Sequence, residues 1–172
     1  MAIKEGWTGR VYEDFEVGDI FRHALGRTVL ATDNIWFTLL TMNTNQVHFN
    51  VEYAKGTEFE RPLVVSSLTL AIVLGLSVAD TSENAVANLG WEDIKLLRPV
   101  FAGDTLWAES EVLGVRESRS REGCGIIGIR TRGVNQRGEV VLEFRRSFMI
   151  FKRAAAAEVT ATFPLAAEDW RV

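Results

Sequence analysis

The feature that most constrains this chain is an eighteen-residue stretch, Pro62–Ala79, that contains no charged side chain. It meets the minimal length of a membrane-spanning helix. However, Pro62 cannot continue a helix behind itself, and Ser66, Ser67 and Thr69 are typical of a helix start, so about thirteen helical residues remain, or roughly 20 Å, against a ~30 Å hydrocarbon layer. A helix that is apolar on every side but too short to span should be surrounded by protein. We therefore predict a buried helix over residues 67–80 and no membrane span.

The segments after this helix carry strand signals with almost no helical pattern among them. A polar turn at residues 81–84 comes first, and Gly138 supplies the turn between the last two strands. Residues 140–145 alternate between apolar and polar side chains, which is typical of a sheet with one covered face. Strands are predicted over residues 87–97, 105–115, 125–134 and 139–151.

The segments before the central helix are shorter and mixed. An irregular arm leads into a strand near Ile20–Val29, and Thr32 and Asp33 are the expected N-cap of a helix that continues to Met42. A loop over residues 43–49 then leads to a second short helix over residues 50–54. We expect Gly56 to end that helix in a left-handed conformation.

This order of elements predicts an α+β fold of the hot-dog type, in which an antiparallel sheet curls around one long central helix. We predict one domain over residues 1–153 and an Ala-rich tail over residues 154–172, in which Trp170 either docks or belongs to a frayed end. The open edge of such a sheet is usually covered or paired with another subunit. A homodimer or a higher homo-oligomer is therefore expected.

The charge pattern excludes some functions. Lys and Arg number 19 against 23 Asp and Glu, giving a formal net charge of −4, and no basic run or basic helix face stands out. Nucleic-acid binding is therefore not expected. The densest charges, over residues 116–122, have mixed signs between strands, which favours a solvated hairpin loop over a phosphate-binding patch.

The thiol and imidazole content limits cofactors and location. The single cysteine, Cys124, cannot form a disulfide within the chain, so we expect a structural thiol in a reducing, cytoplasmic compartment; no secretory signal is seen in residues 1–18. Two histidines far apart and one cysteine lack metal-ligand spacing. The glycines at 123, 125 and 128 alternate in a strand and form no phosphate loop. No metal and no redox or nucleotide cofactor is expected.

The residue most suited to chemistry is His48, which lies in the amide-rich segment Thr41–His48. Histidine is the side chain whose ordinary pKa lets it take and return a proton near neutral pH. A histidine in a polar loop can also simply cap the helix that follows. His23 lies in a strand pattern without such neighbours, and we assign it no role.

From Tyr12 to about Phe151 the chain resembles the MaoC-like dehydratases, the (R)-specific enoyl-CoA hydratase group of the hot-dog superfamily. The arm Tyr12–Asp19, the helix start at residues 32–33 and the segment Arg98–Leu106 carry the resemblance, which is closest to the mesaconyl-CoA hydratases, also named β-methylmalyl-CoA dehydratases. Their loop usually reads Ser-Gly-Asp-x-Asn-Pro-Leu/Ile-His. Residues 41–48 match it at Asn45 and His48, and depart from it where Asn43 replaces the acid.

The resemblance implies roles for individual residues. His48 would be the acid–base group, while Asn43 and Asn45 would order the reacting water, because a carboxamide cannot act as a base at neutral pH. The family uses a backbone amide at the start of the central helix to bind the thioester oxygen, which points here to Ser66 and Ser67; plain N-capping is the alternative for these serines.

Two carboxylates near the loop could replace the missing acid. Glu52 lies four residues after His48, and Asp33 lies at the start of the preceding helix. Solvent exposure is the alternative for Glu52, and helix capping is the alternative for Asp33.

The resemblance therefore implies an enzyme that reversibly hydrates or dehydrates a short acyl-CoA thioester, with CoA present only as part of the substrate. Two alternatives stay open. The same fold could hydrolyse the thioester as a thioesterase, or, because Asn43 replaces the acid, it could bind acyl-CoA without turnover. Arg61 and Arg98 could pair with a carboxylate of the acyl group, or could be solvated surface residues.

Overall fold

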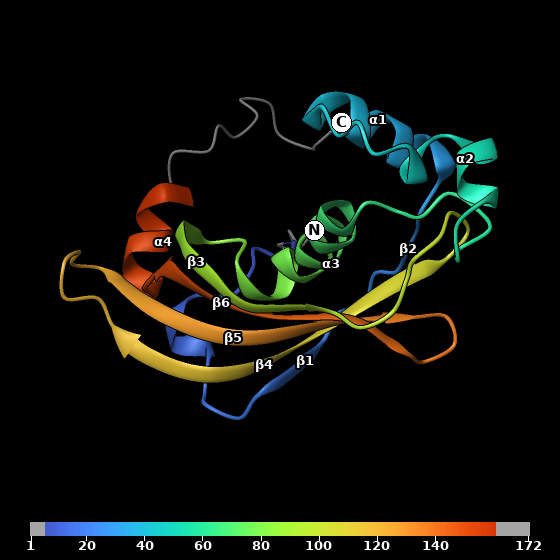
Figure 1. The fold of residues 1–172 in the computed structure, drawn as a ribbon. Helices are drawn as coiled ribbons and strands as arrows, with labels where there is room; N and C mark the ends of the chain where they lie inside the picture. Colours follow the sequence, from blue (N-terminus) through green and yellow to red (C-terminus); the bar gives the residue numbers. More distant parts are fainter. Residues whose placement is uncertain (1–5, 161–172) are drawn as a thin grey trace, which may run out of the picture.

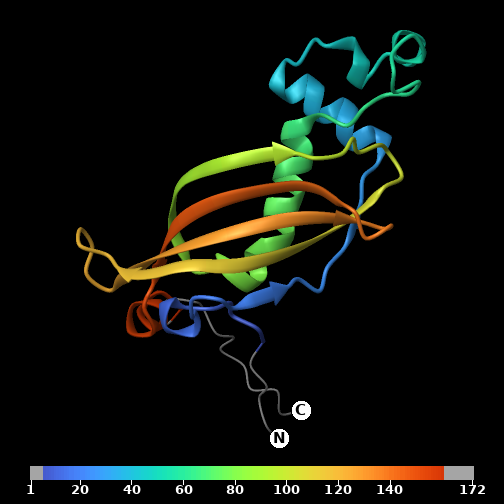
Figure 2. The ribbon, with the colours of Figure 1, turned by 60° about the horizontal axis from the view of Figure 1, so that its bottom comes forward.

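A computed structural model of the chain describes residues 6–160. Helix α3 (Ser66–Thr81) lies across a six-stranded antiparallel sheet that curves beneath it (Figures 1 and 2). This is the predicted α+β hot-dog arrangement. The main strands are ordered β1-β4-β5-β6-β3, with β2 paired to β4 beside β1. The strands span β1 (Ile20–Arg22), β2 (Arg27–Thr28), β3 (Ala85–Leu96), β4 (Thr105–Glu117), β5 (Cys124–Asn135) and β6 (Val140–Phe151).

The strand predicted over Ile20–Val29 is wrong in one respect, since it is divided into β1 and β2. Both pieces pair with β4, and the His23 N–H still donates to the Ala108 carbonyl of β4 at 3.1 Å, so the gap between the two pieces is residues 24–26. The gap contains a close approach, because a Cβ on Gly26 would lie 2.3 Å from Nε1 of Trp107. The indole of Trp107 thus lies directly against the backbone of Gly26, where a side chain would not fit.

The helical elements before α3 are α1 (Ala31–Thr41), the 3-10 turn η2 (Gln46–His48) and α2 (Val51–Lys55); the 3-10 turn η1 (Tyr12–Asp14) opens the chain. Leu30, rather than Thr32 or Asp33, is the N-cap residue of α1, although the Asp33 carboxylate still accepts a hydrogen bond from the Leu30 N–H at 2.9 Å. Gly56 has φ −84°, so the predicted left-handed end of α2 is wrong. The left-handed residue lies instead at Met42, after α1, with φ 54°.

Helix α3 packs one side directly on the sheet backbone. At Gly133 of β5 an added Cβ would lie 2.5 Å from Cγ2 of Val73. The expectation that protein surrounds α3 on all sides holds for this side only, because Ala71, Gly75 and Ala79 are exposed on the other. The residues that α3 buries are Leu68, Thr69, Ile72, Val73, Ser77 and Thr81.

The end of the described chain is helical. Helix α4 (Arg153–Thr160) occupies the first part of the predicted tail, and Trp170 lies outside the described residues. Among residues 6–160, no helix is both long and apolar enough to cross a bilayer.

Candidate functional site

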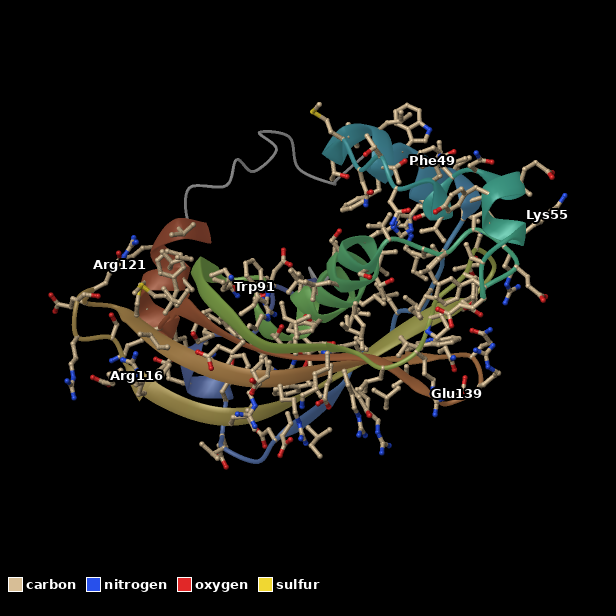
Figure 3. All side chains as sticks on the ribbon, viewed as in Figure 1. Phe49, Lys55, Trp91, Arg116, Arg121 and Glu139 are labelled. Atoms are coloured by element: carbon tan, nitrogen blue, oxygen red, sulfur yellow. The ribbon has the colours of Figure 1, made fainter. Side chains whose placement is uncertain are left out.

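Helices α1 and α2 stand beyond the sheet, next to the N-terminal end of α3, in both ribbon views (Figures 1 and 2). Figure 3 shows Phe49, which follows η2, in this same group of elements. The loop that carries His48 and the first turn of α3 are therefore neighbours in space, as the resemblance required.

Asn34 of α1 holds these two segments together. Its Nδ2 donates to the carbonyl oxygens of His48 (2.7 Å) and Leu63 (3.0 Å), and its Oδ1 accepts from the Val65 N–H (2.9 Å). The residue is only 3% exposed. Sequence analysis did not identify Asn34, and the sole local signal was a carboxamide directly before the apolar residues 35–37.

His48 is nearly buried, and its ring has a defined orientation. The Nδ1 atom lies 2.9 Å from the carbonyl oxygen of Leu63. Because a carbonyl can only accept, Nδ1 carries the hydrogen, and in the neutral ring Nε2 is left with the lone pair. Leu63 precedes the start of α3 by three residues, so one short segment connects the basic nitrogen to the head of that helix.

Asn43 and Asn45 organise the loop ahead of His48. The Asn43 Oδ1 accepts from the Asn45 N–H at 3.1 Å, and the Asn45 Oδ1 accepts from the Val47 N–H at 3.3 Å. Both carboxamide oxygens are thus used in local turns, while neither NH₂ group has an acceptor within residues 6–160. These two groups can donate hydrogen bonds to a ligand or to water, but they cannot take up a proton.

Ser66 and Ser67 begin α3 with backbone N–H groups that have no acceptor among the described residues. The first N–H groups of the helix that donate are those of Leu68 (3.0 Å) and Thr69 (3.1 Å), both to the Val65 carbonyl. The N–H groups of Ser66 and Ser67 donate to no described residue. The alternative in which the serine hydroxyls cap the helix does not occur, because Val65 is the N-cap residue and no side chain caps it. Free N–H groups at a helix start favour an oxygen with negative charge.

Two hollows flank this region. One, of about 450 Å³, is lined by α1 and the following loop, including Leu39, Asn43 and Phe49. The other, of about 250 Å³, lies at the head of α3 and includes Leu63 and Ser66. The His48 ring lines neither, although its chain neighbour Phe49 lines the first hollow and its hydrogen-bond partner Leu63 lines the second. In the single chain, Asn43 and Ser66 therefore face different hollows on either side of the histidine.

The two carboxylates considered as replacements for the acid are engaged elsewhere. Asp33 accepts from the Leu30 N–H and pairs with Arg27 Nη2 at 2.8 Å. Glu52 pairs with Lys55 Nζ at 2.7 Å, and its side chain is 81% exposed. Figure 3 shows Lys55 pointing outward at the far end of α2. Both carboxylates therefore already have partners away from His48.

His23, to which no role was assigned, belongs to a buried network at the C-terminal end of α3. Its Nδ1 donates to Asp80 Oδ2 at 2.9 Å, and its Nε2 accepts from Ser110 Oγ at 2.9 Å. Burial lowers the pKa of His23, although Asp80 opposes that shift. The arrangement is like a hydrolase triad, but Ser110 is 1% exposed and its oxygen also bonds Thr131 at 2.8 Å. A nucleophile must reach its substrate, so this network is structural.

The charged hairpin and the cysteine lie away from the site. Arg116 and Arg121 project from the β4–β5 hairpin, at the end of the sheet opposite α2 (Figure 3), in agreement with a solvated loop. Cys124 is buried and free. Within the described residues, no group of three His, Cys, Asp or Glu side chains is placed to hold a metal ion.

Comparison with known proteins identifies relatives of the whole region. The profile of a family described as mesaconyl-CoA hydratase matches residues 3–165. The chain is 39% identical over 153 residues to a mesaconyl-CoA hydratase of Cereibacter sphaeroides, covering 89% of this chain and 44% of that protein. It is 35% identical over 154 residues to a β-methylmalyl-CoA dehydratase of Chloroflexus aurantiacus, covering 90% of this chain and 44% of that protein.

A solved structure supports the same relationship. The MaoC-like dehydratase from Rhodospirillum rubrum is 29% identical and superposes with a TM-score of 0.73, covering 84% of this chain and 99% of that one. The chain spans less than half the length of the two curated relatives, and essentially the full length of this shorter structure.

Proposed function

The chain belongs to the mesaconyl-CoA hydratase family, and from that premise we propose that it reversibly adds water to the double bond of a short enoyl-CoA thioester, giving the 3-hydroxyacyl-CoA. The observation that carries the proposal is the hydrogen bond from His48 Nδ1 to the Leu63 carbonyl oxygen. It leaves Nε2 as the basic nitrogen and ties it to the segment that begins α3. The proton carrier and the oxyanion site are thereby joined through Leu63.

In the forward direction, Nε2 of His48 takes a proton from water as the water oxygen bonds to Cβ of the enoyl group. The electron pair of the double bond moves toward Cα and the thioester oxygen, to which the N–H groups of Ser66 and Ser67 donate. The imidazolium of His48 then returns the proton to Cα on the same face. Dehydration is the reverse sequence, and it uses the same groups.

Asn43 and Asn45 would order the attacking water through their free NH₂ groups. Because their carboxamide oxygens already accept backbone hydrogen bonds, they can orient the oxygen of the water but cannot take its proton. The proposed reaction therefore depends on His48 alone for proton transfer. It uses no metal and no redox cofactor, and CoA enters only as part of the substrate.

The test is enoyl-CoA hydration, followed by the loss of absorbance at 260 nm. We expect His48→Ala to lower kcat by at least ~10²-fold, because general acid–base catalysis contributes about that much or more. Glu52→Gln is the matched control, since this exposed carboxylate pairs only with Lys55 in the described structure, and its rate should stay near that of the parent. An unchanged rate for His48→Ala would refute the proposal. Release of free CoA, read with a thiol reagent, would identify a thioesterase instead.

We further propose that a second copy of the chain completes the protein as a homodimer. The uncovered side of α3 presents small residues one turn apart, Ala71, Gly75 and Ala79, and the outermost strand β3 carries half-exposed apolar side chains such as Leu89 and Trp91 (48% and 46%). On α1, Trp36 and Leu40 are 65% and 78% exposed. Exposed apolar surface of this extent usually belongs to an interface.

Sedimentation velocity tests the homodimer. We expect the parent to sediment as a dimer and Gly75→Arg to sediment as a monomer, because an arginine would prevent close approach of a second helix. Ser120→Arg, in the exposed β4–β5 turn, is the control and should stay dimeric. A parent that sediments as a monomer would exclude the homodimer. We also propose a cytoplasmic location, which the lone, buried and unpaired Cys124 supports.

A further inference from the structure

The hollow at the head of α3 is lined by three segments of the chain and is suited to hold an acyl group. Ser66 and Thr69 line it from α3, Leu63 from the segment bound to His48, and Leu97, Arg98 and Val100 from the chain that follows β3. Most of its lining is apolar. Arg98 is its only charged lining residue, and no carboxylate lines it.

The backbone around Arg98 is fixed against the site. The N–H groups of Leu97 and Arg98 donate to the Val141 carbonyl oxygen at 2.8 and 3.3 Å, and the Val100 carbonyl oxygen accepts from the Val64 N–H at 2.9 Å. This second bond joins the segment of Arg98 to the segment that leads into α3. The backbone of Arg98 is therefore held at a fixed position relative to the start of α3, where the thioester oxygen is proposed to bind.

The guanidinium of Arg98, by contrast, is uncommitted. Within residues 6–160 it makes no hydrogen bond, and its ion pair with Glu139 is long, at 3.8 Å between Nε and Oε1. The other oxygen of Glu139 already accepts from Asn135 Nδ2 and Arg137 Nε, both at 2.8 Å. The Arg98 side chain is 55% exposed. A planar guanidinium with its donors free, at the wall of an apolar hollow, is suited to bind a carboxylate in a bidentate manner.

We infer that Arg98 binds a carboxylate at the far end of the acyl group and so selects dicarboxylic enoyl-CoA substrates. The inference rests on the proposed function. The position of Arg98 supports an acyl carboxylate over a phosphate of CoA, because Arg98 lines the same small, largely apolar hollow as Ser66, whose N–H is proposed to bind the thioester oxygen.

Arg61 offers a matched comparison. It lies two residues before Leu63, which lines the hollow, but its guanidinium has a different partner. Its guanidinium carbon stands 3.9 Å from the centroid of the Phe101 ring, a cation–π contact, and it does not line the hollow. The structure thus separates the two arginines that the sequence left equivalent.

The experiment compares two substrates across three variants. The kcat/KM for hydration is measured for two substrates. The acyl group of mesaconyl-CoA carries a free carboxylate, and that of crotonyl-CoA does not. We expect Arg98→Gln to lose about 10- to 100-fold on mesaconyl-CoA, the usual worth of a hydrogen bond to a charged group, and under about 3-fold on crotonyl-CoA. Arg98→Lys should recover part of the loss because it keeps the charge, and Arg61→Gln should lose little on either substrate.

Two results would overturn the inference. An equal loss on both substrates would mean that Arg98 binds the CoA portion, and no loss on either would mean that it binds neither. If the parent hydrates neither substrate, the proposed function fails, and calorimetry then decides the inference separately. In that case succinyl-CoA should bind the parent more tightly than butyryl-CoA does, and Arg98→Gln should abolish the difference; equal binding of the two thioesters by the parent would refute it.

Discussion

The Oδ1 atom of Asn34 accepts the N–H of Val65 across 2.9 Å, immediately ahead of the first turn of α3. Through its Nδ2, the same side chain also fixes the carbonyl oxygens of His48 and Leu63. Asn34 touches no reacting atom in the proposed mechanism. It is a positioning residue, and it sets where the histidine loop stands relative to the free amides of Ser66 and Ser67.

We expect Asn34→Ala to lower the free energy of unfolding by about 3 kcal/mol, from roughly 1 kcal/mol for each of the three hydrogen bonds of this buried side chain, and to lower kcat by more than about 10-fold. Urea denaturation and the hydration assay measure the two effects. Asn50→Ala, which removes the cap of α2, is the control and should cost about 1 kcal/mol. If Asn34→Ala were as active as the parent when folded, Asn34 would not position His48.

Asn43→Asp should increase the rate of hydration. The carboxylate can still accept the Asn45 N–H, so the loop keeps its turn, and the site gains a second group able to move a proton. We expect kcat to rise by about 10-fold or more, and its pH profile to gain a limb from the new carboxylate. Asn50→Asp adds the same charge nearby and preserves an N-cap, so it should leave kcat unchanged. A parent and an Asn43→Asp variant that both bind acyl-CoA without turnover would instead indicate a non-catalytic binder.

The central helix and the four long strands were predictable because their signals are local. A charge-free run bounded by Pro62, alternation over residues 140–145 and a turn glycine at Gly138, whose φ is 76°, each act within a few residues. The break between β1 and β2 was not predictable. It lies where the Trp107 indole covers Gly26, a contact between residues about eighty positions apart in the chain.

The site could be predicted only in part, for the same reason. His48 was identified by its residue type and by the family resemblance, and its proposed role remains a prediction. Asn34 gains its importance from partners at positions 48, 63 and 65, and His23 gains its burial from Asp80 and Ser110, which lie 57 and 87 positions away. No spacing rule within one element reports such contacts.

Gly133→Ala should destabilise the fold at the contact between α3 and the sheet. An added Cβ would lie 2.5 Å from Cγ2 of Val73, and overpacking of this kind typically costs about 1–3 kcal/mol. Gly114→Ala is the control, because nothing lies within 4 Å of its Cβ position. The double variant Gly133→Ala, Val73→Ala should lose less stability than the sum of the losses of the two single variants. If the changes in the free energy of unfolding were strictly additive, the two residues would not interact.

The stability of the fold should fall as the pH is lowered through the range in which His23 titrates. Burial lowers the pKa of His23 below its ordinary value of 6.5; Asp80 opposes this, while Arg146 and Arg10 add to it. From pH 6.5 down to the folded pKa, the unfolded chain therefore binds a proton that the folded chain does not. The stabilisation is complete above pH 6.5 and declines below it, by at most about 1.4 kcal/mol per pH unit.

Urea denaturation between about pH 5 and 7.5 isolates this histidine from the aspartates and glutamates, whose ordinary pKa values lie lower. The contribution of Asp80 to stability is lost in a different pH range. Burial raises the pKa of Asp80, but hydrogen bonds from His23 and Arg10 outweigh that effect and hold the pKa below 3.8. This contribution therefore disappears only in stronger acid. In His23→Gln the side chain cannot titrate, and the slope of stability against pH should become flatter over the upper window. The same slope in parent and variant would assign the pH dependence to another group.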